Sequence, residues 1–68
     1  MLQPEILLGN REAYRAGRFV YTVEGRNVLV TRDDKTGPLV QTVAMYEYRN
    51  QDHAADAAWH LATLQANA

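Results

Sequence analysis

Two histidines and an aspartate near the C-terminus are the residues whose types and spacing can do chemistry. His53, Asp56 and His60 stand at i, i+3 and i+7, which places them on one face of a helix over residues 51–65. Such a set can bind Zn²⁺ or Ni²⁺, and a His–Asp pair can act as a general base. Thr63 continues the same polar stripe, and no nucleophile or phosphate-binding loop accompanies it. We therefore expect a solvated helix face, with no metal, no cofactor and no catalytic residue.

Tyr46, Tyr48 and Arg49 are the stronger candidates for function. Tyrosine and arginine carry much of the binding energy in protein interfaces. The three residues lie at the end of a predicted strand, residues 39–48, which runs beyond its neighbour, so that residues 45–48 lack a strand partner. We expect a protein-binding surface centred on them. The alternative is that an N-terminal helix or the N-terminal arm covers both rings.

The predicted sheet face that carries the two tyrosines also carries Val20, Leu29 and Val40 among threonines. These aliphatic side chains would form an apolar floor for a partner or for a second copy of the chain. The alternative is an ordinary solvent-facing sheet surface. The predicted binding site therefore comprises Tyr46, Tyr48, Arg49, Val20, Leu29 and Val40.

A β-hairpin over residues 18–33 is the clearest element of the sequence. Gly25-Arg26 is suited to a two-residue type II′ turn. This turn sets Val23 opposite Val28, Tyr21 opposite Val30, Phe19 opposite Arg32, Thr22 opposite Leu29 and Val20 opposite Thr31. A second turn at residues 34–37 leads into the third strand. The expected partners are then Val40 with Thr31, Thr42 with Leu29 and Val43 with Val28.

The register predicts which side chains the helices cover. The covered face would carry Phe19, Tyr21, Val23, Val28, Val30, Leu39, Val43 and Met45. The opposite face would carry Arg18, Val20, Thr22, Leu29, Thr31, Val40, Thr42, Ala44, Tyr46 and Tyr48.

Two helices are expected to flank the strands. The C-terminal helix runs from about residue 51 to 65, with Asn50 or Asp52 as its N-cap and an alanine-rich apolar face. Residues 4–16 predict a short N-terminal helix that ends at Gly17. The alternative is one helical turn over residues 11–16, capped by Asn10, after an extended arm at residues 6–8.

Composition limits the class of protein. The chain has 68 residues, a net charge of −1 and no cysteine, so we expect one small α+β domain over residues 1–68. Six arginines and one lysine are balanced by eight acidic residues, which makes a nucleic-acid partner unlikely. No long apolar run and no signal peptide is visible, so we expect a cytoplasmic protein without membrane contact. The chain is also small for a substrate pocket.

The predicted order of helix, three antiparallel strands and helix resembles the double-stranded RNA-binding domain. The stretch from Ala54 to Ala62 is similar to the alanine-rich last helix of that family. In that family, lysines at the start of the last helix hold phosphates. Here the matching stretch reads Gln51, Asp52 and His53, and the one lysine, Lys35, lies in a predicted turn. The resemblance therefore supports the fold and not RNA binding.

The sequence thus predicts a small non-enzymatic protein-binding module that forms a homodimer or docks on a larger complex. A phage- or plasmid-encoded inhibitor or regulator of a host system, such as an anti-CRISPR protein, is one kind of protein with these properties. The alternative is a nucleic-acid-binding regulator that uses Arg18, Arg32, Arg49 and the tyrosines.

Overall fold

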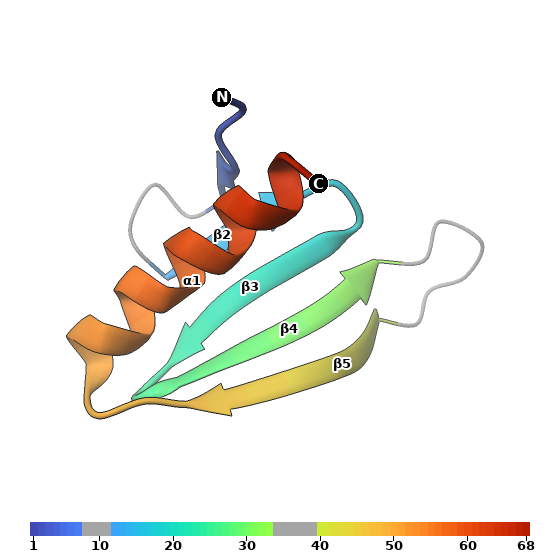
Figure 1. The fold of residues 1–68 in the computed structure, drawn as a ribbon. Helices are drawn as coiled ribbons and strands as arrows, with labels where there is room; N and C mark the ends of the chain where they lie inside the picture. The colour runs from blue at the N-terminus through green and yellow to red at the C-terminus, as the bar shows by residue number, and fades with distance from the viewer. Residues whose placement is uncertain (8–11, 34–39) are drawn as a thin grey trace.

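The strands follow one another across a single antiparallel sheet in chain order, and one helix packs on one face of it (Figure 1). The computed structural model describes residues 1–7, 12–33 and 40–68. Its elements are β1 (Glu5–Ile6), β2 (Ala13–Ala16), β3 (Phe19–Glu24), β4 (Asn27–Asp33), β5 (Val40–Glu47) and α1 (Gln51–Ala66). The prediction of a small α+β protein with a C-terminal helix is confirmed. The three-stranded meander and the N-terminal helix are not.

The β3–β4 hairpin has the predicted register. Val23 lies opposite Val28, Tyr21 opposite Val30 and Phe19 opposite Arg32. Gly25 has a φ of 60°, which a type II′ turn requires at its first central residue and which side chains other than hydrogen disfavour. The turn chemistry alone was therefore enough to fix this hairpin.

The predicted N-terminal helix is wrong, because β2 occupies part of its range. Ala13–Ala16 pairs antiparallel with β3, with Ala16 opposite Phe19. Gly17 has a φ of 62°, but it begins a two-residue turn with Arg18 and does not cap a helix. The alternative single turn over residues 11–16 also fails at β2, whereas the extended arm is correct at Ile6 in β1. Asn10 lies outside the described residues.

Because strands take the place of the first helix, the topology differs from that of the double-stranded RNA-binding domain. Five antiparallel strands precede the helix within the described residues. The resemblance was therefore misleading for the fold at the N-terminus.

The predicted register of the third strand is also wrong. Met45 and not Thr42 lies opposite Leu29, and Tyr46 and not Val43 lies opposite Val28. Beyond a β-bulge, Thr42 lies opposite Thr31, so Val43 is the extra residue of the bulge. The register differs from the predicted one by three residues over residues 44–47 and by two over residues 40–42. An odd shift exchanges the two faces of a strand. The turn at residues 34–37 and Leu39 lie outside the described residues.

Helix α1 begins where the sequence predicts. The Asn50 side chain accepts a hydrogen bond from the His53 main-chain N–H at 2.9 Å, which identifies Asn50 and not Asp52 as the N-cap. The buried side chains of the helix are all alanines: Ala54, Ala55, Ala58 and Ala62. Their small size allows the helix to lie close to the sheet. Leu64, near the end of the helix, is exposed.

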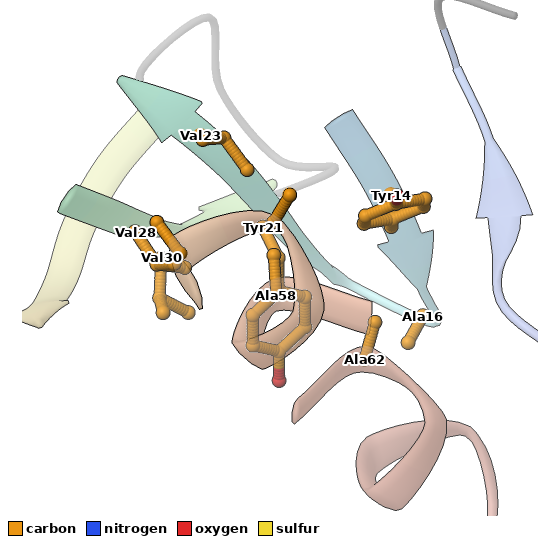
Figure 2. Packing of buried hydrophobic residues seen from close by; sticks show 10 residues of the cluster. Tyr14, Ala16, Tyr21, Val23, Val28, Val30, Ala58 and Ala62 are labelled. Carbon is orange, nitrogen blue, oxygen red and sulfur yellow. The ribbon is translucent and has the colours of Figure 1, made fainter. Parts of the chain in front are cut away.

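The core lies between α1 and strands β2, β3 and β4. The helix packs mainly on β3 and β2 and to a smaller extent on β4. Figure 2 shows the sheet residues Tyr14, Tyr21, Val28 and Val30 with the helix alanines. The Trp59 ring of α1 meets the Tyr14 ring edge to face, with 5.4 Å between the ring centroids.

Candidate functional site

The six residues predicted to form one binding surface are divided between two faces of the sheet. Side chains directly opposite each other across an antiparallel pair share a face. Tyr46 is opposite Val28, which is fully buried under the helix, so Tyr46 lies on the helix-covered face. Leu29 and Val20 lie on the opposite face. The Val40 side chain lies outside the described residues, and Arg49 is exposed after the end of β5.

Tyr48 mainly stabilises the fold and contributes little to the exposed surface. Its main-chain N–H donates to the Arg26 carbonyl at 2.8 Å, and its side chain is partly buried against the core. The end of β5 is therefore paired, and the prediction that residues 45–48 lack a strand partner is wrong. The alternative considered above, that an N-terminal helix or the N-terminal arm covers both rings, is also wrong. Strand β2 occupies the range of that helix, and the arm with β1 lies at the opposite edge of the sheet from β5.

Tyr46 lies at the margin of the helix-covered face. The helix leaves part of this face open, and 47% of Tyr46 remains exposed. Its phenol is near that of Tyr21, a buried residue of β3. Burial raises the pKa of Tyr21 above its ordinary value, and the Tyr46 phenol raises this pKa further. Tyr46 thus lies on the helix-covered face and is still accessible to solvent.

The opposite face of the sheet carries an apolar patch. Met45 lies beside Leu29, and both Met45 and Val43 are large exposed hydrophobic residues, at 63% and 49% exposure. Val20 and Leu29 are half-buried on the same face. Figure 1 shows α1 on the other side of the sheet, away from this patch. The structure thus places Val20, Leu29 and Met45 on this face, and Met45 is the most exposed of the three.

Strand β5 is one edge of the sheet, and its outer side meets no other strand within the described part of the chain. Main-chain groups along an antiparallel strand face its partner at alternate residues. Since Tyr48 bonds to Arg26 on the β4 side, Tyr46 and Ala44 also face β4. The N–H and C=O groups of Met45 and Glu47 consequently point away from the sheet. An eight-residue edge with such groups is a template for another strand.

Met45 and Val43 were not predicted to be surface residues, although the sequence contains a signal for it. The last strand of a meander is an edge strand, and residues 40–47 contain only one charged residue, Glu47. That residue forms an ion pair with Arg26 at 3.2 Å. Few charges would have to be removed from water if another chain covered this edge.

The arginines are spread along the sheet. Arg18 and Arg32 lie near one end of the β3–β4 hairpin, whereas Arg49 follows β5 at the other end. The seven residues of β4 separate the two ends by about 20 Å. This arrangement does not provide a continuous basic surface of the kind that tracks a nucleic-acid backbone.

His53, Asp56 and His60 are exposed on α1, as a solvated helix face requires. Among the described residues there is no group of three or more histidine, cysteine or acidic side chains that can hold a metal ion. In the same residues, no helix has the length and apolar character that a membrane crossing needs.

The fold and the edge strand define a class of molecule: a small antiparallel sheet with one helix layer and one open side. Comparisons with protein-family models, with curated proteins and with solved structures give no match for the chain.

Proposed function

We propose that the protein is a small non-enzymatic protein-binding domain and that its contact surface is the edge formed by β5. The observation that carries the proposal is the exposure of β5 on three sides. Met45 is exposed on one face, Tyr46 is exposed on the other, Val43 is exposed at the bulge, and main-chain groups point outward between the two faces. We call this set of Val43, Met45, Tyr46 and the outward main-chain groups of Met45 and Glu47 the β5 edge.

Exposed apolar residues on both faces favour a partner that adds a strand over one that lies flat on the sheet. A flat partner on the open face would cover Met45 but would leave Tyr46 in solvent. A strand that pairs with β5 continues both faces of the sheet, so its side chains reach both residues. It also provides hydrogen bonds for the outward N–H and C=O groups.

The proposal revises the predicted site. Tyr46 remains in it, and Leu29 and Val20 adjoin it on the open face. Tyr48 supports the position of β5 from the core side. A regulator or inhibitor that blocks a larger protein complex, as expected above, would use such an edge to occupy a binding site on its target.

Site-specific photocrosslinking in extracts of the source cell tests the proposal. A benzophenone amino acid replaces Met45 in one variant and His60, on the exposed side of α1, in the matched control. We expect protein adducts from position 45 and few from position 60. Equal adducts from both positions, adducts to nucleic acid, or no adduct from position 45 would contradict the proposal.

A further inference from the structure

The partner strand for the β5 edge can be sought in the chain itself. This step rests on the proposed function, since it names the occupant of the same edge. A second copy presents the same outward groups at Met45 and Glu47, so two β5 strands can pair antiparallel about a two-fold axis. In such a pair, a residue on the axis lies opposite itself, and its outward N–H and C=O bond to their own counterparts.

Three residues are candidates for the position on the axis, and their chemistry separates them. An axis at Glu47 would set two carboxylates directly opposite each other, which destabilises a strand pair. An axis at Val43 would fall on the β-bulge, where the regular alternation of main-chain groups is disrupted. An axis at Met45 avoids both problems and lies between the two.

We infer that the chain forms a homodimer in which β5 pairs with β5 of a second copy, with Met45 on the two-fold axis, to give one continuous sheet. The dimer has ten strands, five from each copy. Met45 lies opposite Met45 of the second copy. Val43 lies opposite Glu47 of the second copy, and Ala44 opposite its Tyr46.

The side chains on both faces fit this register. On the open face, the two Met45 side chains meet over the apolar patch that each shares with its own Leu29. On the helix side, each Tyr46 ring extends over Ala44 of the other copy, where a small side chain leaves room for it. Glu47 is already paired with Arg26 of its own chain, so its charge is partly neutralised where the strands meet.

The helices do not obstruct the pairing. Because the axis is perpendicular to the sheet, both helices lie on the same face of the joined sheet. Each packs mainly on β3 and β2, and the two β3 strands are separated by five strand spacings, about 24 Å. A helix with its side chains is about 10–12 Å across, so the two helices do not meet.

Self-association of the purified chain is the first test. We expect sedimentation equilibrium to show a dimer at micromolar concentration. Met45→Lys places two ammonium groups on the axis and should weaken the dimer by about 100-fold or more. His60→Lys adds the same charge on the exposed side of α1 and should leave the dimer unchanged. A monomeric wild-type chain at high micromolar concentration, or equal effects of the two substitutions, would overturn the inference.

Disulfide trapping tests the register itself, because the chain has no cysteine of its own. In the proposed dimer the two Met45 Cα atoms are about 5.5 Å apart, within the range that a disulfide spans. The two Val43 Cα atoms are about 14 Å apart, which is too far. Mild oxidation should therefore join Met45→Cys chains and not Val43→Cys chains. Trapping through Val43→Cys alone would refute the register.

The two proposals fail in different ways. If the pure chain is monomeric but position 45 crosslinks to a different protein, the homodimer is wrong and the binding function stands. If position 45 gives neither dimer nor adduct, both are wrong.

Discussion

The two edges of the sheet are completed in different ways. At one edge, β1 has only two residues, and the N-terminal arm before it is attached to the end of the helix. Asn67 accepts a hydrogen bond from the Leu2 N–H and donates one to the Leu2 carbonyl, each at 2.9 Å. At the other edge, β5 has eight residues and exposes apolar side chains on both faces.

The difference is informative because an exposed sheet edge invites association with other chains. Short edge strands and covering segments are common ways to prevent it. The first edge has both features. Within the residues that the structure describes, the β5 edge has neither, apart from its bulge, and it places Met45 and Tyr46 where a protective edge would place charges. We therefore interpret the first edge as a structural boundary and the second as a functional one.

The largest expected contrast is between an aromatic residue in the core and one at the β5 edge. Tyr14→Ala removes a ring that is 2% exposed and packed against Trp59, and should lower the free energy of unfolding by about 3–5 kcal/mol. Tyr46→Ala should cost about 1 kcal/mol or less in the monomer. Urea unfolding at a concentration that keeps the chain monomeric measures both. Equal losses would show that Tyr46 is a core residue.

Proline substitutions along β5 should reveal which main-chain groups the fold uses. Ala44→Pro removes an N–H that faces β4 and should cost about 3 kcal/mol or more. Met45→Pro removes an outward N–H and should cost about 1 kcal/mol or less while it weakens the dimer. Circular dichroism melts, combined with sedimentation, separate the two effects. A greater loss of stability at Met45 would reverse our assignment of the outward groups.

Releasing the N-terminal arm should have a smaller effect. Asn67→Ala removes the two hydrogen bonds to Leu2, as well as the bond that the Asn67 amide donates to the Thr63 carbonyl. All three are exposed, so we expect a loss of about 1 kcal/mol. Hydrogen exchange of the β1 amides should accelerate, and exchange in β4 should not. Unchanged exchange at β1 would show that the arm is held by other contacts.

The smallest expected effect is on the free energy of unfolding at alkaline pH. The pKa of Tyr21 is raised in the folded state, so the folded chain holds its phenol proton at a pH where the unfolded chain has lost it. The stability from this group is complete below pH 10, the ordinary tyrosine value, and is lost as the pH rises through the folded pKa. Tyr21→Phe should reduce this loss, and Tyr46→Phe should reduce it less. Thermal melts between pH 9 and 12 provide the measurement, and a loss unchanged in Tyr21→Phe would exclude this origin.

Local turn and cap chemistry accounts for the parts of the fold that the sequence predicted. Gly25-Arg26 was sufficient for the central hairpin, and Asn50 for the start of the helix. Gly17-Arg18 is the same type of pair, and it lies eight residues earlier. A glycine with positive φ can end a helix or begin a hairpin turn. The pairing of residues 13–16 with β3 decides between the two, and such pairing is not a property of the local sequence.

The site was harder to predict than the fold because it depends on register. The faces of β5 are exchanged by a shift of three residues, and the bulge at Val43 changes the shift along the strand. Neither the size of the shift nor the position of the bulge follows from the alternation of apolar residues, since Met45 and Tyr46 are both suited to a buried position. The predicted site and the proposed one share Tyr46 of β5, a strand in which Val43 and Met45 are also exposed.

The contact between Leu2 and Asn67 brings the two ends of the chain together beside β1, on the side of the sheet opposite β5. A short glycine-rich linker can therefore join these ends, and the chain can be reopened at the turn between β3 and β4. Such a circular permutant would keep every strand pair and lose only the turn that connects β3 to β4. It would also show whether the sheet needs its chain order or only its neighbours. Fusion tags at either end would be held far from the surface through which the protein is proposed to act.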